Sequence, residues 1–295
     1  MISIIITSYK EPKTIGRAID SFLNQSINSK YELIVAAPDK QTQDVVKKYS
    51  KKNKQVKLFK DKGEGKSSAL NQLLPKLKSD ILILSDGDVY VGENSVNKIF
   101  EAFKNQDVGC VSGRPIPQNS QKNLFGYWSH LLCYAANKLR EKRDKKGEFL
   151  ECSGYLWAFR NNIIKKFPVD IAEDTIVPIL FWLKNWKVKY AKEAEVYVKF
   201  PSNLNEFIKQ KRRAIASHGA LSKYIPPRKI PRMKTFFNEI SGSFLILAFP
   251  KNFNGILYAF FLFPIRLYVW LNFFYNAKIK KRSYSDKWKR IKSTK

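Results

Sequence analysis

Two aspartates at the end of an apolar run are the residues in this chain whose chemistry can be read most directly. Residues 81–84 are Ile-Leu-Ile-Leu, and Asp86, Gly87 and Asp88 follow one residue later. The run predicts a buried parallel strand, in which charge is expected only where the strand leaves the sheet. Gly87 permits close approach, so both carboxylates could reach one divalent cation. A simple Asp-Gly turn after a strand is the alternative.

The first half of the chain alternates apolar, β-rich runs with helical patterns, which is typical of an α/β fold with a mostly parallel sheet flanked by helices. Loops after the strands of such a sheet form its ligand cleft, and here they carry Glu11, Asp39, Lys66 and the two aspartates. Acids and a lysine should therefore meet at one edge. Strands are predicted at Ile2–Ile6, Leu33–Ala36, Val56–Phe59, Ile81–Leu84, Val108–Val111 and Glu195–Lys199, and helices at Thr14–Gln25, Thr42–Lys52, Ser67–Leu77, Ser95–Asn105, Asn123–Lys146 and Thr175–Leu183.

The charge balance indicates an anionic partner. The 295 residues contain 54 Lys and Arg against 25 Asp and Glu, a formal net charge of +29. Nucleic acid, an anionic membrane surface and phosphate-bearing substrates are the candidates. The sequence shows no zinc-ligand spacing or aromatic RNA-binding signature, and its basic residues cluster beside apolar runs, so we expect no nucleic-acid partner. Nine basic residues lie between Lys209 and Lys234 and nine more between Lys278 and Lys295.

The C-terminal third predicts association with a membrane. Gly255–Ala277 is almost wholly apolar with one charge, Arg266, and is long enough to cross a bilayer, whereas Phe236–Phe249 is marginal. A helical hairpin, helices lying in the membrane plane and helices buried against the rest of the protein all stay open. We place one α/β domain at residues 1–222 and a basic, apolar, membrane-associated helical region at 223–295. Because residues 1–6 already form a strand, no leader is expected, which favours the cytoplasmic face.

The order of these motifs resembles glycosyltransferase family 2, the inverting GT-A enzymes, and most of all its membrane-associated branch with cellulose and hyaluronan synthases. The resemblance covers about residues 1–220. It implies a GT-A nucleotide-sugar-binding fold followed by membrane-associated helices. The motifs are Thr7-Ser-Tyr9-Lys-Glu11, Asp39, Gly65-Lys66, Asp86-Gly-Asp88, Glu173-Asp174 and Gln210-Lys-Arg-Arg213.

The resemblance also implies which residues bind a nucleotide-diphosphate sugar. Asp88 would ligate Mg²⁺ or Mn²⁺, and Asp86 would face the nucleoside. Glu11 and Asp39 would accept hydrogen bonds from the ribose and base, although each could instead serve a helix start or a turn. Lys66 would face phosphate oxygens or lie free in solvent. The implied donor-binding residues are Thr7, Tyr9, Glu11, Asp39, Lys66, Asp86, Gln210 and Arg213.

Asp174 matches the general base of the family, which takes the proton of an attacking acceptor hydroxyl. Its alternative role is to stabilise the start of the following helix, where acids are favourable. Gly154, Tyr155, Trp157 and Glu173 fall where the family binds its acceptor, although Trp157 could equally be core. Ala214 replaces the tryptophan that stacks on the acceptor sugar, which argues against processive polymer synthesis.

The sequence therefore predicts a metal-dependent inverting glycosyltransferase at the cytoplasmic membrane face, with a nucleotide-diphosphate sugar as donor and a lipid-linked or glycan acceptor. A polyprenyl-phosphate glycosyltransferase is the alternative enzyme, and Gln210 and Arg213 argue against it. A non-catalytic nucleotide or polyanion binder would use the same cleft. The sugar, the base and the acceptor are not determined by the sequence.

Overall fold

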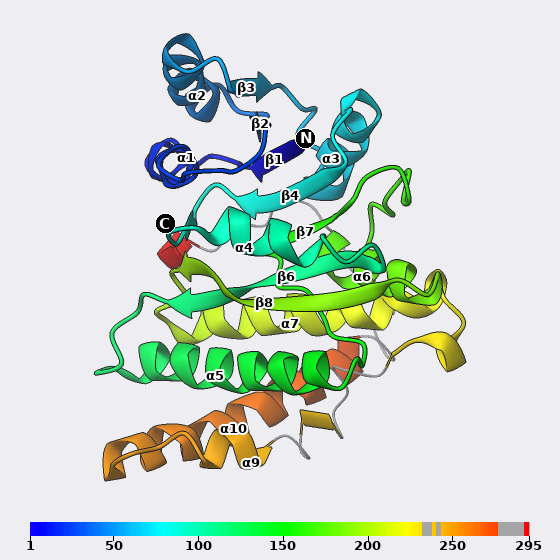
Figure 1. The fold of residues 1–295 in the computed structure, drawn as a ribbon. Helices are drawn as coiled ribbons and strands as arrows, with labels where there is room; N and C mark the ends of the chain where they lie inside the picture. The colour runs from blue at the N-terminus through cyan, green and yellow to red at the C-terminus, as the bar shows by residue number, and fades with distance from the viewer. Residues whose placement is uncertain (232–237, 240–242, 277–291, 295) are drawn as a thin grey trace.

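A computed structural model describes residues 1–231, 238–239, 243–276 and 292–294. Its centre is an eight-stranded sheet in the order β3-β2-β1-β4-β7-β6-β8-β5 (Figure 1). The strands are β1 (Ile2–Thr7), β2 (Tyr31–Ala36), β3 (Val56–Phe59), β4 (Ile81–Asp86), β5 (Tyr90–Val91), β6 (Val108–Pro117), β7 (Leu156–Arg160) and β8 (Lys187–Val198).

The sheet is mixed. β3, β2, β1 and β4 are mutually parallel, β7 inserts antiparallel to both β4 and β6, and β8 runs parallel to β6. The expected parallel half is confirmed, whereas the sequence pattern missed β5 and β7 and made β6 and β8 too short. β7 was missed because Leu156–Arg160 is apolar on both faces and too short to show a period.

Helices cover both faces of the sheet because successive strand residues point to opposite sides. In β1, Ile4 and Ile6 pack with α1, α2 and α4, whereas Ile5 packs with α3 and α6. Each helix presents an apolar stripe to its face of the sheet. The helices are α1 (Ile15–Leu23), α2 (Lys40–Lys52), α3 (Lys66–Leu73), α4 (Ser95–Ala102), α5 (Leu124–Lys145), α6 (Glu173–Leu183) and α7 (Leu204–Ala220).

The C-terminal part adds α9 (Ser243–Leu247) and α10 (Phe253–Phe274), and α10 packs against α5 and α7 (Figure 1). Ala259, Leu262 and Val269 of α10 are buried, and the indole Nε1 of Trp128 in α5 donates to the carbonyl oxygen of Tyr258 at 2.6 Å. In the described part of the chain, α10 is the one helix long and apolar enough to cross a membrane. The apolar run at 236–249 lies partly outside the described residues.

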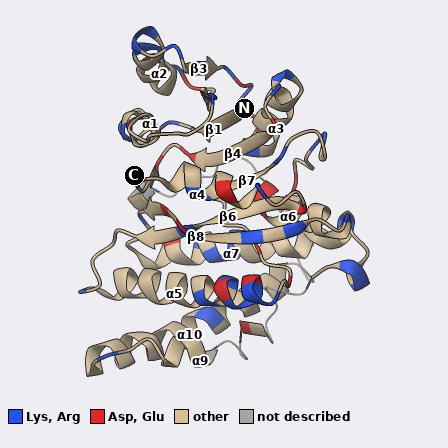
Figure 2. Ribbon diagram, in the orientation of Figure 1, with Lys and Arg blue, Asp and Glu red and all other residues tan. Residues whose placement is uncertain are grey.

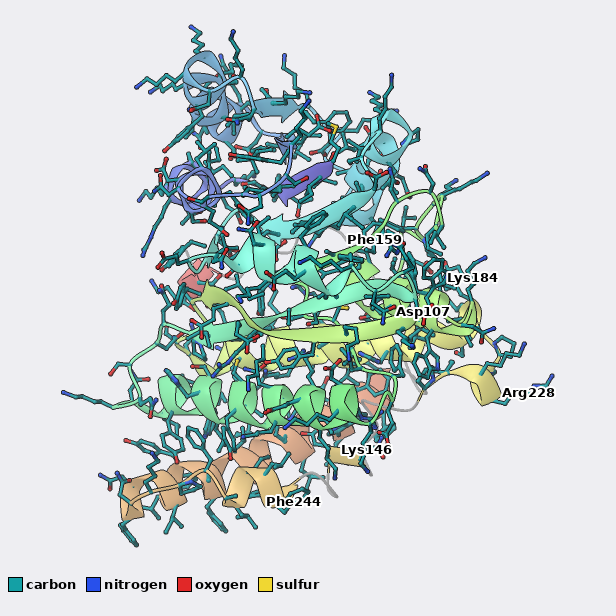
Figure 3. The ribbon with its side chains drawn as sticks, viewed as in Figure 1. Asp107, Lys146, Phe159, Lys184, Arg228 and Phe244 are labelled. Carbon is teal, nitrogen blue, oxygen red and sulfur yellow. The ribbon has the colours of Figure 1, made fainter. Side chains whose placement is uncertain are left out.

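The opposite side of α10 is apolar and exposed. Phe253, Ile256 and Phe260 are 71%, 57% and 67% exposed. Phe244 of α9 is 59% exposed and points away from the body of the molecule (Figure 3). Helix α10 therefore packs on the rest of the protein along one face and exposes apolar side chains along the other. The 1–222 and 223–295 division stays a prediction, with α10 in direct contact with the first part.

Candidate active site

The tips of β1 and β4 lie side by side because the two strands are parallel neighbours in register, with Thr7 opposite Asp86. The Thr7 hydroxyl donates to Oδ1 of Asp86 at 3.3 Å, and the Gly87 N–H donates to the Thr7 carbonyl oxygen at 3.0 Å. Any side chain at Gly87 would collide with Ser8 and with the carboxylate of Glu11. Glycine is therefore required between the two aspartates because the loop after β1 packs directly on the turn after β4.

Lys66 connects Asp86 at the tip of β4 to Glu173 at the start of α6. It is the first residue of α3, and its Nζ lies 2.7 Å from Oδ1 of Asp86 and 2.9 Å from Oε1 of Glu173. Burial alone would lower the pKa of Lys66, but the charges of the two carboxylates raise that pKa well above its usual value. Burial raises the pKa of Glu173, and Lys66 opposes that rise. The single positive charge of Lys66 thus lies between two acids and stabilises both within the site.

Asp174 lies on the first turn of α6, where a carboxylate is favoured by the helix dipole. A Cβ atom added to Gly154 would lie 2.5 Å from Oδ2 of Asp174, so the missing side chain makes room for this carboxylate. Ser217 of α7 holds the same turn: its hydroxyl accepts from the Ala172 N–H at 3.1 Å and donates to Thr175 at 3.3 Å. The position of Asp174 therefore depends on three separate segments.

The segment before β7 and the middle of α7 meet across the site. Tyr155 is enclosed, its burial raises its pKa, and its hydroxyl accepts a hydrogen bond from Nε2 of Gln210 at 3.3 Å. Oε1 of Gln210 is buried and has no hydrogen-bond partner among the described residues. An amide oxygen buried without a partner is costly unless a ligand or water supplies one. Gln210 is therefore placed to accept from a ligand in this space.

A single cavity of about 510 Å³ unites most of the predicted site residues. Its wall also includes cations and an ion pair that sequence reasoning did not assign to the site. The predicted residues that line it are Thr7, Tyr9, Glu11, Lys66, Asp86, Asp88, Gly154, Tyr155, Glu173, Asp174, Gln210 and Arg213. The additional residues include Arg140, Lys199, Lys211, Ser217, Glu239, Arg266, Trp270 and Thr294.

Two predicted site residues are placed elsewhere. Trp157 is 0% exposed in β7 and stacks on Phe159, so it packs in the core and does not line the cavity as described. Asp39 caps α2: its Oδ1 accepts from the Thr42 N–H at 3.0 Å, and its Oδ2 accepts from the Lys10 N–H at 2.6 Å. It lies outside the described cavity wall and holds the loop that carries Glu11. Trp157 and Asp39 thus have structural roles here, and their assignments to acceptor and donor stay predictions.

The residues missed from sequence come mainly from α7 and the C-terminal part. Arg266 of α10 pairs with both carboxylate oxygens of Glu239, and the Trp270 indole donates to Oε2 of Glu239 at 2.8 Å. Burial would raise the pKa of Glu239, but Arg266 holds it below its usual value. One charge within an apolar helix was the available signal, and it pointed to Arg266 but not to its partner.

The donor set suits a hard cation only in part. Among the described residues, no group of three His, Cys, Asp or Glu side chains is arranged to hold a metal. Mg²⁺ is usually bound by one or two carboxylates together with substrate phosphates, so an aspartate at a strand tip facing a cavity is sufficient. Asp86 and Asp88 both line the cavity, and Asp86 pairs with Lys66. The residues fit a cation that binds together with a diphosphate.

Comparison with solved structures gives the fold class. A mannosyltransferase, PcManGT from Pyrobaculum calidifontis, solved with GDP-Man and Mn²⁺, has a TM-score of 0.64 at 15% identity, covering 95% of this chain and 86% of that one. The curled mixed sheet with its flanking helices is the GT-A fold. The family model for glycosyl transferase family 2 matches residues 3–167, and the chain belongs to that family.

Curated relatives are distant and longer. An N-acetylglucosaminyltransferase of Neorhizobium galegae is 22% identical over 53% of this chain, and a beta-monoglucosyldiacylglycerol synthase of Nostoc sp. is 25% identical over 42%. This chain spans 39% and 28% of those two proteins. A probable glycosyltransferase, YdaM of Bacillus subtilis, is 22% identical over 90% of this chain and 66% of its own length.

Proposed function

We propose that this protein is a metal-dependent inverting glycosyltransferase that moves a sugar from a nucleotide-diphosphate donor to an acceptor hydroxyl. The observation that carries the proposal is the single cavity onto which Asp86, Asp88 and Asp174 all open. The tip of β4 and the start of α6, far apart in the sequence, deliver these three carboxylates to one space. A non-catalytic binder would have no use for a third carboxylate facing the other two across that space.

The proposed reaction assigns one task to each side of the cavity. The acceptor oxygen attacks the anomeric carbon while the bond from that carbon to the diphosphate oxygen breaks, and Asp174 takes the hydroxyl proton. Asp88 is the residue that would hold Mg²⁺ or Mn²⁺, and a cation there neutralises charge on a departing diphosphate. Arg213 would donate to the diphosphate from the opposite wall, and Oε1 of Gln210 would accept from a hydroxyl of the donor sugar.

The donor nucleoside would lie along the strand tips against Thr7, Tyr9, Glu11 and Asp86. Gly154, Tyr155 and Glu173 stay our candidates for contact with the acceptor. Glu173 and Asp86 share Lys66 as partner, so Lys66 is proposed to position both acids rather than to face only phosphate. Asp39 would contribute indirectly, through the loop that carries Glu11.

The acceptor is proposed to be lipid-linked or a glycan presented at the cytoplasmic face of a membrane. The exposed apolar side of α10 and the nine basic residues between Lys278 and Lys295 support a membrane surface as the site of action. The cavity reaches Arg266 and Trp270 of α10, so a route from that surface to Asp174 would be short. The similarity to a beta-monoglucosyldiacylglycerol synthase supports a lipid acceptor.

The test is transfer measured with a panel of nucleotide sugars, with Mn²⁺ and with chelator, for the wild type and single variants. Asp174→Asn should lower turnover by about 10²–10⁴-fold, the range of a general base, with an unchanged circular dichroism spectrum. Asp88→Asn should abolish the response to Mn²⁺. Asp107→Asn, on the surface before β6 and distant from the strand tips, is the matched control (Figure 3). Wild-type turnover in Asp174→Asn would contradict the proposal.

A phosphate acceptor is the second candidate because Arg140, Lys211, Arg213 and Arg266 line the cavity. A phosphate is already ionised at neutral pH and needs no base to remove a proton. Transfer to a polyprenyl phosphate that survives Asp174→Asn, together with failure on hydroxyl acceptors, would favour this candidate.

A further inference from the structure

A second hollow lies between the first turns of α5 and α10, apart from the described wall of the catalytic cavity. Its volume is about 360 Å³, and its lining is Gln121, Lys122, Tyr127, Asn252, Asn254, Gly255 and Tyr258. It adjoins Phe253 and Ile256, at the start of the exposed apolar side of α10. The hollow therefore lies at the border between polar and apolar surface.

The first turn of α10 lines this hollow, with Asn252, Asn254 and Gly255 in its wall. Asn252 caps the helix by accepting from the Gly255 N–H at 2.9 Å, and its carbonyl oxygen accepts from the Ile256 N–H at 3.1 Å. Phe253 and Asn254 therefore have no helical carbonyl to which their N–H groups can donate. Such groups, with the positive end of the helix dipole, bind anions readily.

Tyr127 provides an independent sign of a missing ligand. It is 8% exposed, and its buried hydroxyl has no hydrogen-bond partner within the described ranges. A Cβ atom added to Gly255 would lie 2.6 Å from this hydroxyl, so the hydroxyl points at the first turn of α10. A buried hydroxyl without a partner is costly, and an acceptor oxygen in the hollow would remove that cost.

The surrounding charge selects an anion. Lys122 lines the hollow, and neither residues 119–135 nor residues 248–265 contain an acid. Figure 2 shows no acidic segment on the first turns of α5 and α10, whereas the far end of α5 carries both signs. A ligand with several acceptor oxygens can accept from Tyr127, from Lys122 and from the helix N–H groups together.

We propose that this hollow is a phosphate-binding site. The phosphate comes from the headgroup of an anionic phospholipid or from the free ion, two sources with the same chemistry. If the lipid is the source, the site anchors α10 at headgroup level while Phe253 and Ile256 enter the acyl region.

The first experiment titrates the full chain with inorganic phosphate, against chloride at equal ionic strength, and follows thermal unfolding. Tyr127→Phe removes only the hydroxyl and should weaken phosphate affinity by about tenfold, the value of one hydrogen bond to a charged group. Its stability without phosphate should be equal to or above that of the wild type, because an unpaired hydroxyl is lost. An unchanged phosphate response in Tyr127→Phe would overturn the site.

The second experiment separates the two sources with vesicles of phosphatidylcholine, with and without phosphatidate. A lipid source predicts weaker binding to phosphatidate vesicles for Tyr127→Phe and Lys122→Gln than for Lys146→Gln, an exposed lysine at the other end of α5. If the three variants bind phosphatidate vesicles equally but Tyr127→Phe loses its response to inorganic phosphate, the ligand of the hollow is the free phosphate ion. Donor hydrolysis in detergent should match the wild type in all three variants, which keeps this test separate from the proposed catalysis. Variants that bind both probes as the wild type does contradict the proposal.

Discussion

The two walls of the catalytic cavity are built in different ways. The strand-tip wall brings Thr7, Glu11, Asp86 and Asp88 from the ends of two neighbouring parallel strands and the loops after them. Asp86 accepts from Thr7 of the other strand, and Glu11 accepts from Ser8 of its own loop. The helical wall brings Arg140, Gln210, Arg213 and Arg266 from α5, α7 and α10. The helical wall therefore adds cations to a space that Glu173 and Asp174 of α6 also line. A diphosphate that carries a cation on one side needs both kinds of wall.

The walls also differ in what holds them. The strand-tip wall rests on main-chain pairing within the sheet, which a side-chain substitution does not remove. The helical wall rests on side-chain contacts between helices, such as the pair of Arg266 with Glu239. We therefore expect the largest losses of stability or turnover when a residue that joins the two walls is replaced. Replacing a residue within the helical wall should cause smaller losses.

Replacing Lys66, which joins the two walls, should have the largest effect on stability. Lys66→Met leaves the buried Glu173 and the half-buried Asp86 without their cation, and breaking a buried pair costs about 3–5 kcal/mol. Because the pKa of Lys66 is raised, its stabilising charge is fully present below 10.5 and is lost only as pH rises through the raised value. Urea unfolding at neutral pH measures the loss of stability in the variant, and urea unfolding in alkali measures how that loss depends on the charge of Lys66.

Lys57→Met is the matched control for Lys66→Met, because Lys57 pairs with Glu32 at 2.7 Å but is 58% exposed. A surface pair contributes at most about 1 kcal/mol. Equal losses in the two variants would show that Lys66 is not the link between the walls.

Gly154→Ala should have the next largest effect, mainly on turnover. The new methyl would lie 2.5 Å from Oδ2 of Asp174 and displace the proposed base. A displacement of about 1 Å can lower turnover by about 10²-fold, while overpacking costs about 1–3 kcal/mol. Steady-state kinetics should show a fall in kcat with little change in the KM for donor. Gly16→Ala, whose methyl would lie 3.2 Å from the Tyr49 hydroxyl, should leave kcat unaltered.

Glu239→Gln tests the helical wall through its pH dependence. The lowered pKa of Glu239 means that its stabilising charge is present above 4.5 and is lost as pH falls through the lower value in the folded protein. The wild type should exceed the variant in stability by about 1.5–3 kcal/mol at neutral pH, the value of hydrogen bonds to a charged group, and the two should converge in acid. A constant difference from neutral pH to below pH 4 would argue against an ionised Glu239.

Ser217→Ala should have the smallest effect. It removes two hydrogen bonds to the first turn of α6, at 3.1 and 3.3 Å, and costs about 1–2 kcal/mol. If Ser217 positions Asp174, kcat should fall severalfold while the KM for donor stays constant. Ser222→Ala, on the surface beyond α7, provides the baseline, and an equal kcat in both variants would leave Ser217 a purely structural role.

Much of the strand-tip wall could be predicted from sequence because its information is local. Alternation of apolar runs and helical patterns predicted β1 to β4, and residues directly after such strands necessarily meet at the carboxyl edge of a parallel sheet. Asp86, Asp88 and Glu11 were placed in the site for that reason. Trp157 lies in the core and Asp39 caps a helix, which are common structural roles for an aromatic residue near a motif and for an acid after a strand, so their assignment to the site stays a prediction.

The sequence alone determined the family-type order of the motifs, the parallel half of the sheet and the acids at its edge, since each depends on neighbours along the chain. Only the tertiary structure decided that β7 enters antiparallel, that Lys66 bridges Asp86 and Glu173, and that α10 brings Arg266 to the cavity. Those outcomes depend on contacts between segments that are distant in the sequence, such as the pair of Lys66 with Glu173. Local propensity cannot encode such contacts, because packing of whole elements selects them.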